Sequence, residues 1–242
     1  FPHDNSAIGI SNGSPTEDVV SSVNGGPSWT TVGRVPGMGL LYLGKEDRIY
    51  GIFERYETTT SGTIRTHTAM SSNDLGATWT EIHPKFEGLP AKDVRITILA
   101  VDSTSDRIYA TVEDPGYNRS KGIYYSDDMM QTWTLLDPSL KNIEPVEIVL
   151  AYEGRIFIAT MRNGVLEYKP SHSGQVQERN NGIFSYRANT LMITHTDDIL
   201  VHSYGGIQIS NNGGYSWHQS GTDIISPSSM IDLPSGDIFV GS

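Results

Sequence analysis

The sequence has 242 residues, a formal net charge of -11 and no cysteine. An acidic surface repels nucleic acid and anionic membranes, and the lack of cysteine excludes disulfides, thiolate metal sites and cysteine nucleophiles. Only 19% of the residues are charged, and 25 glycines and 12 prolines give a turn-rich composition that is typical of sheet proteins. No window approaches about 18 consecutive apolar residues, so we expect no membrane span.

All four tryptophans end copies of one pattern, S-x-[D/N]-x-G-x-[S/T]-W. Asp or Asn can close a turn on the backbone, and glycine supplies the positive φ that such a turn needs. The Trp then starts the next strand and brings a large apolar face to the core. Only the third copy departs at glycine, where it has Met130. We interpret each copy as a hairpin staple, with the structural residues Asn24, Trp29, Asp74, Trp79, Asp128, Trp133, Asn212 and Trp217.

A second repeat runs out of step with the first. Each copy has an acidic residue or glycine followed by a β-rich run, as at residues 47–50 and 106–109, and each follows another apolar run. Two adjacent short runs with a turn between them predict a hairpin. One unit therefore has four strands at a period of roughly 40 to 50 residues, which indicates a β-propeller blade.

In chain order, we expect blades at residues 38–83, 95–137, 147–179 and 189–221, of which the third has lost its box and its Trp. A fifth blade combines two C-terminal strands, residues 228–233 and 237–242, with N-terminal strands that end at Trp29. We therefore predict an all-β fold, a single β-propeller domain over residues 1–242. It has about five four-stranded blades and is closed by strands from both termini, which leaves no exposed edge.

The boxes and hairpins resemble those of the Asp-box, or bacterial neuraminidase repeat, propellers of the sialidase-like superfamily. These include sialidases, two-domain xyloglucanases, sortilin-type receptors, a photosystem assembly factor and many secreted bacterial proteins. The resemblance covers almost the whole chain and implies that the boxes lie on the outside of the propeller, away from the central binding face. We expect an extracellular or periplasmic location.

One stretch resembles a sialidase site. Arg34-Val35-Pro36 precedes the first inner strand and Glu54-Arg55 closes the second, where sialidases carry similar motifs. Arginine suits a substrate carboxylate, which it binds bidentately. Such enzymes also need a Tyr nucleophile, a Glu that activates it and an Asp acid. The loop at residues 56–62 has no Asp, the segment at 226–230 has no Tyr, and sialidase propellers have six blades rather than five.

Long loops on a rigid scaffold tend to carry binding residues. Tyr56 and Tyr117 lie on the two longest loops inside blades and could stack on sugar rings. The candidate ligand-binding residues are Arg34, Glu54, Arg55, Tyr56 and Tyr117. Acids near the ends of inner strands are alternative glycosidase carboxylates; they are Glu54, Asp102, Glu113 and Asp114.

Three histidines, His195, His202 and His218, lie on neighbouring predicted strands. A metal site needs three or four converging ligands, and alternation along a strand can point these side chains to opposite faces. We expect no metal and no cofactor.

The complete scaffold without a catalytic set favours a monomeric, non-catalytic binding module for a glycan or a protein ligand. The alternatives are a glycoside hydrolase of sialidase-like type and a structural domain of a larger surface protein. A converging acid pair would favour the enzyme, whereas a flat apolar face would favour a protein partner.

Overall fold

The computed structural model describes residues 7–11, 17–23, 26–60, 62–87, 89, 94–114, 119–170, 175–220, 229–233 and 235–241. Strands dominate these residues, and the helical turns are short: η1 (Lys45–Asp47), η2 (Pro138–Leu140) and η3 (Tyr152–Gly154). The predicted all-β class is confirmed. The described part of the chain contains no helix that is long and apolar enough to cross a membrane.

The chain divides into two compact units by its internal contacts. The first unit comprises residues 1–110 and 125–134, and the second comprises residues 111–124 and 135–242. The prediction of a single domain over the whole chain stays a prediction.

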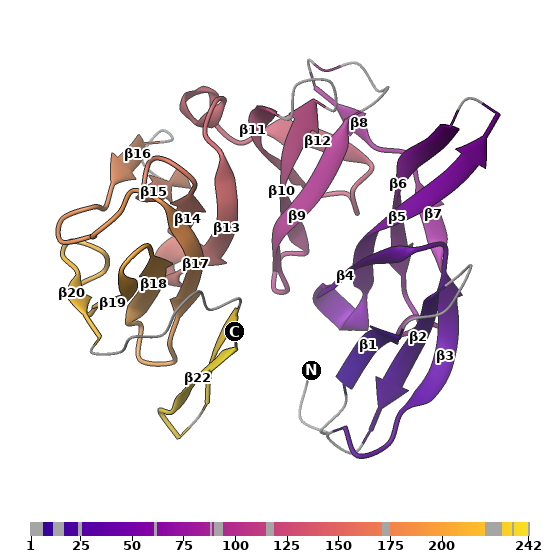
Figure 1. Cartoon of the computed structure of the whole chain (residues 1–242), viewed down its shortest axis with the longest axis horizontal. Coiled ribbons are helices and arrows are strands. Elements are labelled where there is room, and N and C mark those ends of the chain that lie inside the picture. Colours follow the sequence, from indigo (N-terminus) through magenta and orange to yellow (C-terminus); the bar gives the residue numbers. More distant parts are fainter. Residues whose placement is uncertain are drawn as a thin grey trace. The chain divides into compact units, whose positions relative to one another are not determined.

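Three of the predicted blades form four-stranded antiparallel sheets in which each strand pairs with the next along the chain (Figure 1). In the first unit the strands are β4 (Met38–Leu43), β5 (Ile49–Thr59), β6 (Gly62–Ser72) and β7 (Thr80–Ile82). In the second unit one sheet has β13 (Pro145–Leu150), β14 (Ile156–Thr160), β15 (Val165–Lys169) and β16 (Gln175–Glu178). The other has β17 (Ala188–Ile193), β18 (Ile199–Ser203), β19 (Gly206–Ser210) and β20 (His218–Gln219).

The blade predicted at residues 95–137 gains a fifth strand that the sequence did not predict. Its own strands are β9 (Arg95–Asp102), β10 (Arg107–Asp114), β11 (Arg119–Ser126) and β12 (Thr132–Leu135). The short β8 (Lys85–Phe86) pairs in parallel with β12. The ring of Phe86 stacks on that of Trp133 with centroids 5.9 Å apart, so this addition covers a tryptophan that is only 1% exposed.

The two ends of the chain form separate sheets. The N-terminal sheet has three strands, β1 (Ala7–Ser11), β2 (Glu17–Ser22) and β3 (Thr30–Val35). The C-terminal hairpin has two, β21 (Ser229–Asp232) and β22 (Ile238–Gly241). β2 pairs with β1 on one edge and with β3 on the other, so β1 and β3 are the edge strands of this sheet. Ring closure and the count of five blades stay predictions.

The box turn at residues 72–79 shows how its sequence makes a staple. The hydroxyl of Ser72 donates to Asp74 Oδ1 at 2.8 Å, and the Gly76 amide donates to that hydroxyl oxygen at 2.8 Å. Thr78 donates its amide and its hydroxyl to the carboxylate of Asp74. These bonds from Thr78 hold the pKa of Asp74 below its usual value. The indole of Trp79 donates to the Gly76 carbonyl at 3.0 Å, which ties the turn to the following strand.

The third box keeps the same bonds although it lacks the glycine. Met130 adopts the positive φ of 66° that the other boxes assign to glycine, and its amide donates to Ser126 Oγ at 3.0 Å. Its side chain is fully buried, which compensates for the strain of this backbone conformation. In the fourth box, Trp217 donates instead to the Arg179 carbonyl of the preceding sheet, at 2.7 Å.

The first box differs from the expectation for its tryptophan. The amide of Gly26 donates to Ser22 Oγ at 2.9 Å, whereas Asn24 lies outside the described residues. Trp29 is 48% exposed rather than in the core. Its ring lies over Gly9 and Gly26, at 3.9 and 3.8 Å from where a Cβ on each would stand. Neither glycine has a side chain to cover the indole.

In two copies of the second repeat, the arginine that follows the acidic residue links the hairpin to the box of the same blade. Arg48 Nε donates to Asn73 Oδ1 at 2.9 Å. Arg107 makes a bidentate pair with Asp127, at 2.6 and 2.7 Å. Asn73 and Asp127 occupy the variable position just before the turn-closing acid of their boxes, so this position is coupled to the second repeat.

The degenerate third blade replaces its missing box with a buried carboxylate. Glu167 on β15 is fully buried and accepts from Arg155 Nη1 at 3.2 Å and from Arg179 Nε at 2.9 Å, with Lys169 Nζ at 3.5 Å. This blade has no box, so Arg155 pairs with Glu167, whereas Arg48 and Arg107 pair with box residues. A buried charge is tolerated only where it is paired in this way.

Candidate functional site

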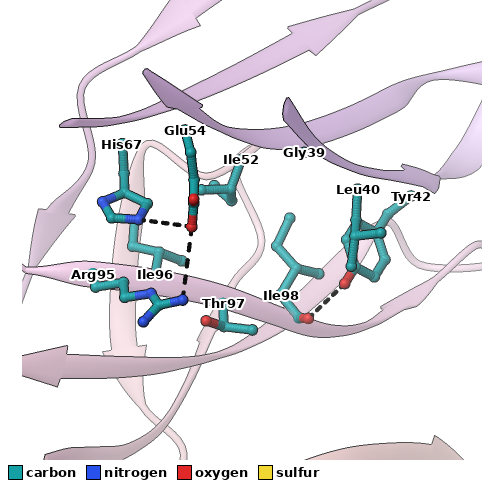
Figure 2. A pocket seen from close by; sticks show the side chains of 10 residues that line it. All are labelled: Gly39, Leu40, Tyr42, Ile52, Glu54, His67, Arg95, Ile96, Thr97 and Ile98. Atoms are coloured by element: carbon teal, nitrogen blue, oxygen red, sulfur yellow. Dashed lines mark hydrogen bonds and ion pairs between the residues drawn. The ribbon is translucent and has the colours of Figure 1, made fainter. Parts of the chain in front are cut away.

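A cleft of about 510 Å³ lies within the first unit, between β4, β5 and β6 on one side and β9 on the other (Figure 2). This volume is in the range of ordinary ligand pockets, about 300 to 1,000 Å³. Most of its walls are aliphatic, and its charged side chains lie together. The lining residues are Gly39, Leu40, Tyr42, Ile52, Glu54, His67, Arg95, Ile96, Thr97 and Ile98.

Strand register brings these side chains to one place. Leu40 pairs with Ile52 across β4 and β5, and Glu54 pairs with His67 across β5 and β6. Side chains directly opposite each other on neighbouring strands project to the same face of a sheet. Leu40, Ile52, Glu54 and His67 therefore share a face although they are distant in sequence.

One end of the cleft carries three charged or titratable groups (Figure 2). Glu54 Oε1 lies 3.3 Å from His67 Nε2 and 3.7 Å from Arg95 Nη2. The exposed fractions of the side chains are 25% for Glu54, 19% for His67 and 38% for Arg95. The carboxylate thus has cationic or hydrogen-bonding neighbours from two strands and still faces the cleft.

The other end is apolar and is tied together by one tyrosine. The hydroxyl of Tyr42 donates to the carbonyl of Ile98 at 2.8 Å, which links β4 to β9 (Figure 2). Leu40 is 68% exposed. An aliphatic side chain that is this exposed beside a cleft is available to contact a ligand.

The acids of the cleft do not form a hydrolytic pair within the described residues. Glu54 is the one carboxylate among the residues that line it, whereas glycosidases need two. Asp102 closes the turn after β9, where it accepts from Thr104 N at 2.9 Å and Ser105 Oγ at 2.7 Å. Burial alone would raise the pKa of Asp102, but the hydrogen bonds from Ser105 and Thr104 outweigh it and lower that pKa.

The predicted site residues fall in different places. Glu54 lines the cleft. Arg34, which is not among the lining residues, pairs with Asp18 at 2.9 Å and keeps 71% of its side chain exposed. Arg55 and Tyr56 lie on β5, but their side chains are outside the described part of the structure, and so is Tyr117 altogether.

Sequence reasoning missed His67 and Arg95 as partners of Glu54. Arg95 opens the inner strand β9, and His67 sits in the middle of β6. The missing information was the register of β5 against β6, which pairs Glu54 with His67. The long loop between these strands, at residues 55–62 in the prediction, is instead mostly strand, because β5 and β6 continue their pairing to Thr59 and Gly62.

The three histidines considered as metal ligands have separate environments. His195 Nδ1 lies 2.7 Å from Asp232 Oδ2, His202 is buried on β18 and His218 is exposed on β20. Burial lowers the pKa of His202. Within the described ranges, no group of three or more His, Cys, Asp or Glu side chains is placed to hold a metal ion.

One further acid has an unusual environment in the second unit. Glu147 on β13 accepts a hydrogen bond from the Leu191 amide on β17 at 2.6 Å. Burial raises the pKa of Glu147 despite this bond. This hydrogen bond joins the first strands of two consecutive sheets. We therefore assign Glu147 a structural role.

Comparison with known proteins gives the fold but no family. No protein-family model and no curated protein matches the sequence. A solved structure of YCF48 bound to D1 peptide matches with a TM-score of 0.61 and 14% identity, over 96% of this chain and 71% of that chain. The extracellular domain of a putative one component system from B. thetaiotaomicron matches with a TM-score of 0.52 and 12% identity, over 98% of this chain and 41% of that chain.

The neighbours are β-propeller proteins. The fold is propeller-like. At identities of 12 to 14% the likeness extends to the fold alone, because one fold supports many unrelated functions.

Proposed function

We propose that this chain is a non-catalytic binding module of the Asp-box propeller type, and that the cleft between β4–β6 and β9 takes a peptide segment of a protein partner. The observation that carries the proposal is the composition of the cleft, an exposed aliphatic wall around Leu40 that ends in the Glu54, His67 and Arg95 cluster. We further propose that the protein acts as a monomer in an extracellular or periplasmic compartment.

A peptide suits this cleft better than a sugar. Leu40 and Ile52 present aliphatic surface, which favours apolar side chains. Tyr42 is the one Phe, Tyr or Trp side chain among the lining residues, and its hydroxyl already donates to a backbone carbonyl, so a stacking surface for sugar rings is small. The carboxylate of Glu54 and the guanidinium of Arg95 together offer an acceptor and donors to a peptide backbone or a charged side chain.

The solved structure of YCF48, which is bound to a D1 peptide, supports a peptide ligand. The glycoside hydrolase alternative has less support, because the described lining holds a single carboxylate and double-displacement or inverting hydrolysis needs two. A purely structural domain would bind nothing at the cleft, which the following experiment tests.

The test is selection of random peptides on the whole chain by phage display, followed by titration of the enriched peptides by fluorescence polarisation. We expect Leu40→Asp to weaken binding by about tenfold or more, because it places a charge on the apolar wall. Leu75→Asp is the matched control, since Leu75 is also exposed, at 44%, and does not line the cleft.

Enrichment of no peptide, or peptide binding that Leu40→Asp leaves unchanged, would overturn the proposal. A parallel glycan array separates the competing ligand class. Saturable glycan binding that Leu40→Asp abolishes would assign the cleft to a sugar instead.

A further inference from the structure

Three aromatic side chains of the second unit are exposed on two segments, the connection that leads into β17 and the turn between β18 and β19. Phe184 and Tyr186 lie on the connection from β16 to β17, and Tyr204 lies on the turn between β18 and β19. Their exposed fractions are 58%, 63% and 83%. We call these three residues the aromatic platform. Aromatic rings are seldom left in water at such fractions without a binding role when they gather in one place.

Sheet topology puts the two segments at the same end of the strands. Successive strands of a meander run in opposite directions. The start of the first strand, β17, and the turn between the second and third strands, β18 and β19, therefore lie at the same end of the sheet. Contacts agree with this placement. The Gly164 amide, in the turn between β14 and β15, donates to the Tyr186 carbonyl at 2.6 Å. The position of a Cβ on Gly205 would lie 3.4 Å from the ring of Phe184, so Phe184 packs beside the turn that carries Tyr204.

Two amide side chains, one of them buried, hold this connection in place. Gln208 is fully buried, and its Nε2 donates to the Gly182 carbonyl at 2.6 Å. Its Oε1 accepts from the Phe184 amide at 3.3 Å and from Ser203 Oγ at 2.9 Å. Asn180 adds two bonds to the β14–β15 turn, from the Val165 amide and to the Asn163 carbonyl, both at 2.9 Å.

Such a fixed loop is preorganised for a ligand. A rigid backbone under exposed rings lowers the entropy that is lost on binding. Tyr and Phe also contribute large contact areas with few rotatable bonds. The buried hydrogen bonds of Gln208 therefore serve to present Phe184 and Tyr204, rather than to bury them.

The size of the platform favours a small ligand over a protein. A fully covered aromatic side chain buries about 150 to 250 Å². At their exposed fractions, the three side chains together therefore expose on the order of 400 Å². A specific protein interface needs about 800 Å² from each partner. The platform reaches roughly half of that area.

The polar residue that follows Tyr186 in the chain also suits a sugar. Arg187 follows Tyr186 in the chain, is exposed, and donates from Nε to Asn189 Oδ1 at 3.2 Å. Within the described residues it forms no ion pair. Its remaining planar donors can bond neighbouring hydroxyls of a sugar, whose C–H face stacks on an aromatic ring.

We propose that the aromatic platform binds a neutral oligosaccharide, with Phe184 and Tyr204 as the stacking residues and Arg187 as a donor to hydroxyls. The net charge of -11 disfavours sulfated and uronic acid chains. The platform belongs to the second unit alone, so this proposal does not depend on the peptide cleft of the first unit.

The test is isothermal titration calorimetry of the whole chain with four neutral hexasaccharides, those of cellulose, xylan, chitin and mannan. We expect saturable binding of at least one. Phe184→Ala and Tyr204→Ala should each weaken it by about tenfold, and both side chains are exposed, so the fold is retained. Tyr152→Ala is the control, because Tyr152 is 77% exposed on η3 at the opposite end of its sheet and should bind as the wild type does.

Two outcomes would overturn the proposal. One is no heat of binding from any of the four sugars at millimolar concentration. The other is binding that both platform variants leave unchanged. Leu40→Asp separates this proposal from the proposed peptide binding, since it should weaken peptide binding and leave sugar binding unchanged.

Discussion

Thr132 donates two hydrogen bonds to Asp128, from its amide to Oδ1 at 2.8 Å and from its hydroxyl to Oδ2 at 2.5 Å. In the fourth box Asn212 takes the same position. Its Oδ1 accepts from the Ser216 amide at 3.0 Å, and its Nδ2 donates to Ser216 Oγ at 2.8 Å. The hydroxyl reverses its role from donor to acceptor, so an amide closes the same turn without a charge.

This comparison predicts how Asp128 contributes to stability. Asp128→Ala should lower the free energy of unfolding by about 1 to 2 kcal/mol at pH 7, because the amide and hydroxyl of Thr132 lose their acceptor. Asp128→Asn should cost less, since Asn212 shows that the amide fits. Urea unfolding at pH 7 measures both.

The same residue predicts a loss of stability in acid. Burial alone would raise the pKa of Asp128, but the hydrogen bonds from Thr132 and Ser126 outweigh it and lower that pKa. A carboxyl whose folded pKa lies below its unfolded value, about 3.9, stabilises the fold above that pH and loses its effect as the pH falls further. The difference in the free energy of unfolding between wild type and Asp128→Ala should therefore become smaller toward pH 3. A difference that stays the same would show that the charge of Asp128 does not cause the stabilisation.

Gly33 should tolerate no side chain. A Cβ there would stand 1.9 Å from the Gly76 carbonyl oxygen, and backbone cannot move aside as a flexible side chain can. We expect Gly33→Ala to cost about 3 kcal/mol or more. Gly154→Ala is the control, because Gly154 has a φ of 71° and no atom within 4 Å of the new Cβ. Its cost should be about 1 kcal/mol, from the left-handed backbone alone. Equal losses in thermal unfolding would contradict the steric explanation.

His202 should make the protein sensitive to mild acid. It is buried, its Nδ1 has no hydrogen-bond partner among the described residues, and burial lowers its pKa. The unfolded chain then binds the proton first, near pH 6.5, so the free energy of unfolding falls as the pH drops below that value. His202→Leu should reduce this slope between pH 7 and pH 5 without loss at pH 7, since it removes an unpaired polar atom. His218→Leu, on exposed β20, should leave the slope as it is.

Met130 sets strain against packing in the third box. Met130→Gly would relieve a positive φ, worth about 1 kcal/mol, but would empty a fully buried site, which costs about 2 to 5 kcal/mol for Met→Ala. We expect a net loss of stability. Met129→Gly is the counterpart, because Met129 has a φ of 59° but is only partly buried. It should be neutral or slightly stabilising, and a gain from Met130→Gly in the same denaturant titration would refute the argument.

The box residues show that residues close together in the sequence determine part of this fold. Ser72, Asp74, Gly76 and Thr78 bond one another within seven residues, so the pattern alone predicts the turn. The hairpins at residues 38–59 and 145–160 follow in the same way from short apolar runs and the turns between them. Such features depend on contacts along the chain, and the turns of these hairpins were predicted correctly, although β5 continues to Thr59 through the predicted loop at residues 55–62.

The cleft depends on different information. Glu54 was a candidate from its motif, but its neighbours His67 and Arg95 follow only from strand register and from the packing of β9 against the first four-stranded sheet. The half-exposed Trp29 and the two-residue strand β8 likewise follow from what surrounds them.

The sequence by itself determined the repeat, the all-β class and the box turns of this protein, because hydrogen bonds within a few residues of each other specify them. Only the tertiary structure decided which side chains meet in the cleft and on the aromatic platform. Those sites join strands and turns that are far apart in the chain, and no periodicity along a single strand encodes which residue lies opposite which.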